Sequence, residues 1–139
     1  MKIVAALIVI LALVIGIVPQ FTDCQSQGGA LTLANGKTVP MKCHWTAQSE
    51  IALAVPLAGL GVVTAVSKRR ESRRIVAGIG TLLGLFVIML PTVLVGVCTN
   101  PDMLCNSIMK PTLIMAGLLT IALSLGAWIY SERQPEPSV

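Results

Sequence analysis

Four long apolar segments constrain this chain more than any other feature. They cover approximately residues 3–18, 47–67, 75–95 and 112–130 of a 139-residue chain. Each approaches the roughly 20 residues that an α-helix needs to cross the hydrocarbon core of a bilayer. Lipid offers no partner for unpaired backbone groups, so each segment must be helical. The sequence therefore predicts an all-α integral membrane protein, with a four-helix bundle as its single domain over residues 1–131.

Charged residues make up 12 % of the chain, about half of the roughly 25 % that is usual in soluble domains. None lies in the middle of an apolar segment, so we expect no ion or proton pathway through the bundle. Glu50 is expected at the start of the second segment, where a helix N-terminus favours a carboxylate. With one histidine and no Gly-rich phosphate loop, the chain offers no catalytic set, and we expect a non-catalytic protein.

The connection between the second and third segments is KRRESRR, residues 68–74, in which five of seven residues are basic. Short basic loops stay in the cytoplasm. This predicts a multi-pass protein of the cell membrane, made of two helical hairpins with both termini cytoplasmic and with outward loops at residues 19–46 and 96–109. The polar residues 132–139 are expected to be disordered. One short turn cannot form a groove, so lipid rather than nucleic acid is the expected partner.

All four cysteines lie in the two outward loops, as Cys24 and Cys43 in the first and Cys98 and Cys105 in the second. The outer compartment is oxidising, and an even count there indicates disulfides. We favour Cys24–Cys43 and Cys98–Cys105, since each bond closes its own loop, although a bond between the loops stays open. Closing the first loop would contribute on the order of 3 kcal/mol.

Two alternative functions follow from the same residues. No cofactor is predicted, but thioether and thiolate groups favour soft ions, so an outward copper site, as Cu(I), is one alternative. Four spans with two outward cysteine pairs also resemble quinone-linked disulfide-generating membrane proteins, although no CxxC is present. Cys43 or Cys105 would then be the reactive thiol. The candidate copper ligands are Met41, Cys43, His44, Met103 and Cys105.

The stretch PMKCHWTAQSE, with CTNPDMLCNS downstream, resembles an uncharacterised family of small four-span prokaryotic membrane proteins. The mark of that family is MKCH, an aromatic residue and Thr-Ala. Its members are often encoded beside ABC transporters with a MacB- or FtsX-like permease. The resemblance thus implies an accessory subunit bound to such a permease, with a homo-oligomer as the other possible assembly. Candidate contact residues are Lys42 and Trp45 of the mark, together with Gly80 and Gly84, whose spacing permits close helix approach.

Overall fold

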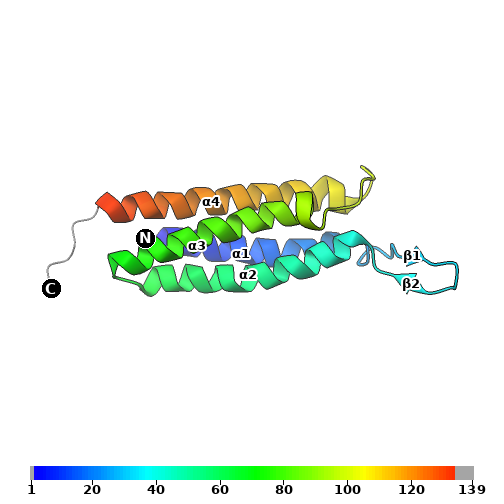
Figure 1. Cartoon of the computed structure of the whole chain (residues 1–139), viewed down its shortest axis with the longest axis horizontal. Coiled ribbons are helices and arrows are strands. Elements are labelled where there is room, and N and C mark those ends of the chain that lie inside the picture. Colours follow the sequence, from blue (N-terminus) through cyan, green and yellow to red (C-terminus); the bar gives the residue numbers. More distant parts are fainter. Residues whose placement is uncertain (1, 134–139) are drawn as a thin grey trace.

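The structure, a computed structural model, describes residues 2–133. Four long α-helices form a bundle: α1 (Lys2–Thr22), α2 (Lys42–Val66), α3 (Arg70–Met89) and α4 (Lys110–Arg133) (Figure 1). All four are long and apolar enough to cross a membrane, which confirms the predicted class of multi-pass membrane protein. Of the predicted disordered tail, Glu132 and Arg133 complete α4, and residues 134–139 lie outside the described residues.

Shorter elements lie at one end of the bundle. Two-residue strands β1 (Leu31–Thr32) and β2 (Thr38–Val39) pair antiparallel in the loop between α1 and α2. The π-helical segment η1 (Leu90–Leu94) continues α3, and a second one, η2 (Cys105–Met109), precedes α4. The loops between α1 and α2 and between η1 and η2 both lie at this end, called here the cysteine end (Figure 1). The turn at residues 67–69 lies at the opposite end, called here the basic end.

The buried residues of each helix recur at spacings of three and four. This spacing turns a single narrow stripe of each helix toward its neighbours, as in left-handed helix bundles. The remaining faces carry exposed isoleucine, leucine and valine side chains, which suits a bundle surrounded by lipid. In α2 the stripe includes Cys43, Ala47, Glu50, Ala54 and Leu57; in α1 it is Ala5, Ile8, Ala12, Ile15 and Pro19.

Small residues let the helices approach closely, α1 against α2 and α3 against α4. A Cβ atom added at Gly117 of α4 would lie 2.9 Å from the carbonyl oxygen of Gly84 in α3. Gly80 similarly faces Ser124 of α4. Gly80 and Gly84 therefore pack inside this chain, and a role for them in contacts with another protein stays a prediction. At the basic end, Arg74 of α3 forms an ion pair with Glu132 of α4, with an N–O distance of 3.0 Å.

Both π-helical segments flank the second cysteine loop, and the sequence analysis did not predict them. A proline is close to each: Pro91 lies within η1, and Pro111 lies two residues after the end of η2. Proline has no N–H to donate to the preceding turn, so regular α-helical bonding fails at these points. Instead, the Leu90 carbonyl accepts bonds from the N–H groups of Val95 and Gly96, at 3.1 and 3.0 Å. Such π segments are frequent at functional sites.

Candidate functional site

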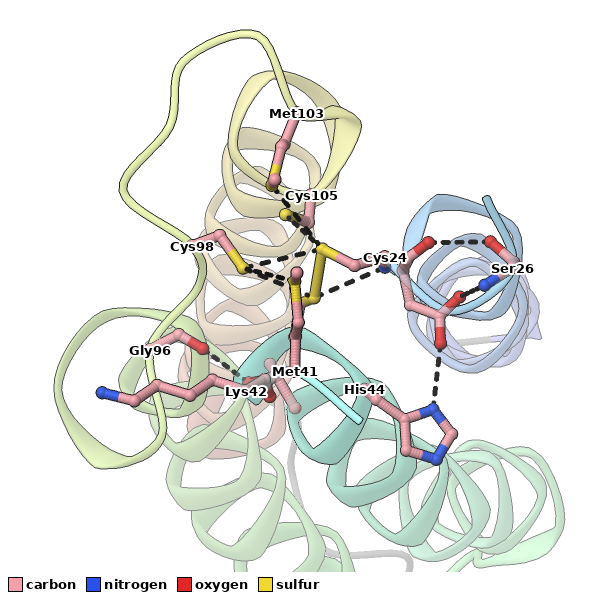
Figure 2. The surroundings of a disulfide bond; sticks show 12 residues. Cys24, Ser26, Met41, Lys42, His44, Gly96, Cys98, Met103 and Cys105 are labelled. Carbon is pink, nitrogen blue, oxygen red and sulfur yellow. Dashed lines mark hydrogen bonds and ion pairs between the residues drawn. A yellow bond between two sulfur atoms is a disulfide. The ribbon is translucent and has the colours of Figure 1, made fainter. Parts of the chain in front are cut away.

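Four cysteines from four separate segments meet at the cysteine end (Figure 2). Cys24 follows α1, Cys43 lies in the first turn of α2, Cys98 follows η1 and Cys105 begins η2. Their four Sγ atoms all lie within 4.8 Å of one another. We call these four residues the four-cysteine centre. Sequence analysis assigned them to two separate loops and did not predict that the sulfurs of both loops meet.

One pair in this centre is bonded and the other is free. Cys24 and Cys43 form a disulfide, which confirms that predicted pair. Cys98 and Cys105 carry free thiols, so a bond between them stays a prediction. The Cys105 sulfur lies 3.3 Å from that of Cys24, and the Cys98 sulfur lies 3.6 Å from Cys24 and 3.7 Å from Cys43. Both thiols thus contact the disulfide.

The four cysteines differ in access to the surroundings. Cys43 and Cys105 are buried, Cys24 is 7 % exposed and Cys98 is half-buried. A cavity of about 180 Å³ reaches Cys24 and Cys105 from the side. It is lined by Thr22, Cys24, Gln27, Gly29, Met103, Leu104 and Cys105.

Two hydrogen bonds to backbone carbonyls lie beside the centre. The Thr46 hydroxyl, wholly buried on α2, donates a 2.7 Å hydrogen bond to the carbonyl of Gly96, two residues before Cys98. Gly96 has a φ of 78°, a conformation that glycine adopts without strain. On the other side, the Gly29 N–H donates to the Cys24 carbonyl at 2.7 Å. A Cβ atom at position 29 would lie 2.9 Å from that oxygen, so this close approach also requires glycine.

A buried carboxylate accompanies the disulfide. His44 Nδ1 lies 3.0 Å from Asp23 Oδ2, and the Ser26 N–H donates to Asp23 Oδ1 at 2.8 Å. Burial raises the pKa of Asp23, but the hydrogen bonds from His44 and Ser26 outweigh it, and the net pKa is lowered. Asp23 was missed by the sequence analysis. A signal was present, because Asp23 precedes Cys24 and His44 follows Cys43, so a bond between these cysteines brings their neighbours together.

The residues proposed as copper ligands separate into two groups. The Met41 sulfur lies 3.9 Å from that of Cys98, and the Met103 sulfur lies 3.9 Å from that of Cys24, so both thioethers border the centre. His44 instead turns to Asp23 and does not belong to the group of mutually close ligand atoms. The predicted set also left out Cys24 and Cys98. Of the predicted contact residues, Lys42 and Trp45 are exposed in the first turn of α2.

Glu50 is not at a helix start, and the expectation of a helix-terminus role for it is wrong. Because α2 begins at Lys42, Glu50 lies in its third turn, on the same buried stripe as Cys43. The side chain is wholly buried, and neither carboxyl oxygen has a hydrogen-bond partner among residues 2–133. Glu50 still lies near the start of the apolar segment 47–67, so the expectation that no charged residue occupies the middle of such a segment stays a prediction.

These features define a multi-pass membrane protein with a cysteine centre at one end of its helical bundle. Over residues 2–130 the chain matches the family described as Domain of unknown function (DUF4418), and it belongs to that family. The predicted membership of an uncharacterised family is thus confirmed. No curated protein and no solved structure matches the chain.

Proposed function

We propose that this protein exchanges disulfide bonds through its four-cysteine centre, on the outer side of the cell membrane. The observation that carries the proposal is the contact of two free thiols, Cys98 and Cys105, with the Cys24–Cys43 disulfide. Thiol–disulfide exchange needs a thiolate beside a disulfide sulfur, and the 3.3 Å between Cys105 and Cys24 brings these atoms into contact. This proposal replaces the expectation of a non-catalytic protein.

The first exchange moves the disulfide from one loop to the other. Cys105 loses its proton and attacks the Cys24 sulfur; the Cys24–Cys43 bond breaks, and Cys43 leaves as a thiolate that takes up a proton. Cys98 then attacks Cys105, its close neighbour in the centre, and releases Cys24. The product is a Cys98–Cys105 disulfide with two thiols in the first loop. No electrons are gained or lost overall, because one disulfide replaces another.

The second exchange reaches an external dithiol. Cys98 is the half-buried member of the centre, so its sulfur is the one that an external thiolate attacks. This attack forms a mixed disulfide with Cys98 and releases Cys105 as a thiolate. The second external thiol then displaces Cys98. The external dithiol has become a disulfide, and the protein, reduced by the same two electrons, carries four thiols.

A peptide with two reduced cysteines tests this function. Oxidised protein in detergent should convert about one equivalent of the peptide to its disulfide, as measured by mass spectrometry. Cys98→Ser should slow the reaction about tenfold or more, because the remaining disulfide is buried. Ser107→Ala, at an exposed position in the same part of the chain, should leave the rate unchanged. A wild-type rate no higher than that of a variant lacking all four cysteines would refute the function.

The orientation belongs to the same proposal. Two helical hairpins with both termini in the cytoplasm would put residues 68–74 inside and the four-cysteine centre in the oxidising compartment. The position of the basic turn at the end opposite the centre supports this orientation. In a background with all four cysteines changed to serine, an impermeant maleimide on intact cells should label an Asn35→Cys variant and leave a Glu71→Cys variant unlabelled. The reverse pattern would invert the proposed orientation.

The partner implied by the family resemblance, an ABC transporter permease, stays a prediction, as does the homo-oligomer. The exposed Trp45, 58 % accessible beside the centre, is a suitable contact for either. Purification from native membranes tests both, with Trp45→Ala expected to reduce the recovery of a bound permease. If the protein is recovered alone and monomeric, both assemblies are refuted.

A further inference from the structure

The spacing of the four sulfurs matches a second kind of site. Four thiolates around one zinc ion lie at about 2.3 Å from the metal, which puts neighbouring sulfurs about 3.8 Å apart. The contacts between the two loops are 3.3, 3.6 and 3.7 Å, and all four sulfurs lie within 4.8 Å. The bonded pair is far too close together for this arrangement, and Cys105 is slightly too close to Cys24 at 3.3 Å. Reduction would let the bonded sulfurs separate.

We infer that the reduced four-cysteine centre binds one zinc ion through Cys24, Cys43, Cys98 and Cys105. The inference rests on the proposed function in one respect, since both require a Cys24–Cys43 disulfide that can be reduced. The ligands come from four segments whose sulfurs already lie within 4.8 Å of one another, and the Thr46–Gly96 hydrogen bond joins the segments of Cys43 and Cys98. Little rearrangement of the chain is therefore needed to complete the site.

One backbone group already faces a sulfur of the centre. The N–H of Cys24 donates to the Cys43 sulfur at 3.4 Å. Such outer-shell donors orient metal ligands and offset their charge.

The sulfur chemistry favours zinc over copper, the metal that the sequence offered only as an alternative. Four cysteine sulfurs in tetrahedral arrangement are typical of zinc. The thioethers of Met41 and Met103 lie 3.9 Å from cysteine sulfurs, at the border of the centre. A Cu(I) site built on thioethers would depend on these methionines, whereas the zinc site would not.

Zinc can bind only after the Cys24–Cys43 disulfide has been reduced. An external dithiol supplies two electrons and two protons to the Cys24–Cys43 disulfide and itself becomes a disulfide. Zinc then binds with release of the protons of those thiols that were still protonated, since thiolates are the ligands. A zinc-bound centre has no free thiolate to attack a disulfide, and an oxidised centre lacks two of its ligands. Metal binding and disulfide exchange therefore exclude one another.

Metal titration of reduced, purified protein tests the inference. Protein reduced anaerobically with a phosphine should bind one Zn²⁺ per chain after dialysis, as measured by elemental analysis. Cobalt(II) in place of zinc should give the intense thiolate-to-cobalt charge-transfer band and the visible bands of a tetrahedral sulfur site. Ser107→Ala should bind as the wild type does. Cys98→Ser should lose more affinity than the about 10- to 100-fold that follows loss of an outer-shell group.

Three results would overturn the zinc site. The first is a stoichiometry well below one zinc per reduced chain, and the second is a cobalt spectrum without thiolate charge transfer. The third is binding of Cu(I) but not of Zn²⁺, with the Cu(I) affinity lowered by Met103→Leu. Oxidation of the dithiol peptide by metal-free protein is measured separately. A failure of the zinc site with intact peptide oxidation would therefore leave the proposed function standing.

Discussion

Two carboxyl groups are buried among residues 2–133, and their surroundings differ. Asp23, 4 % exposed, accepts hydrogen bonds from His44 and Ser26 beside the disulfide. Glu50, wholly buried in α2, has no hydrogen-bond partner among the described residues. A buried polar group costs free energy unless it is paired. The first carboxylate should therefore stabilise the fold, and the second should oppose it.

Asp23→Asn should lower the free energy of unfolding of the oxidised protein by about 1–2 kcal/mol at neutral pH, because hydrogen bonds to a charged acceptor are weakened. Folding lowers the pKa of Asp23. Its stabilising contribution is thus complete above the unfolded-state pKa of about 3.9 and disappears as the pH falls through the lower folded-state value. Thermal unfolding in detergent at several pH values measures this difference. The exposed control Asp102→Asn should change stability by less than about 0.5 kcal/mol. A deficit of Asp23→Asn that persists undiminished in strong acid would contradict the role of the charge.

Glu50→Leu should raise the free energy of unfolding by about 1–3 kcal/mol, the cost of a buried polar group without a partner. Gln48→Leu is the matched control, because position 48 is exposed on the same helix. It should change stability by less than about 0.5 kcal/mol. Denaturant or thermal unfolding of both variants in one detergent gives the comparison. Destabilisation by Glu50→Leu would contradict this prediction and would show that the Glu50 carboxyl group has a stabilising partner.

At the scale of the helices, apolar length and composition predicted the four membrane-spanning elements. The helices continue past the apolar segments, as α2 does by beginning at Lys42 rather than near residue 47. The first turn of α2 was not predicted because it contains polar residues such as His44 and Thr46, which interrupt the apolar pattern. Their side chains bond to Asp23 and to the Gly96 carbonyl in the loops. The π-helical segments could not be predicted either. Proline identifies a local interruption, but the packing around it decides which alternative bonding forms.

Contact between α3 and α4 depends on small residues at their crossing. Gly117→Ala should destabilise the bundle by about 1–3 kcal/mol, since the new Cβ would lie 2.9 Å from the Gly84 carbonyl and force the helices apart. Gly126→Ala in the same helix is the control, because no atom other than those of the adjoining residues and the local helix backbone lies within 4 Å of a Cβ there. That substitution should be neutral or stabilising by up to about 1 kcal/mol, as alanine favours helix. Unfolding in detergent measures both, and equal effects of the two substitutions would argue against the close crossing.

At the scale of the whole molecule, the sequence predicted which residues share an end of the bundle. It indicated that all four cysteines lie in two loops and that Cys24 pairs with Cys43. It could not indicate that both loops meet, because this depends on how the α1–α2 pair packs against the α3–α4 pair. The thioethers of Met41 and Met103 join the centre for the same reason, because each lies beside a cysteine of the other loop. The site is therefore a property of the assembled bundle.

The proposed function depends most on the four sulfurs acting as one exchanging centre. Mapping of disulfides by mass spectrometry in the Cys43→Ser, Cys98→Ser double variant tests this directly, because Cys24 then loses its bonded partner and Cys98 can no longer displace it from Cys105. With the Cys105 sulfur 3.3 Å away, we predict an intramolecular Cys24–Cys105 disulfide in the monomeric protein. A Cys24 that stays reduced under air, or that bonds only to a second chain, would contradict the central claim.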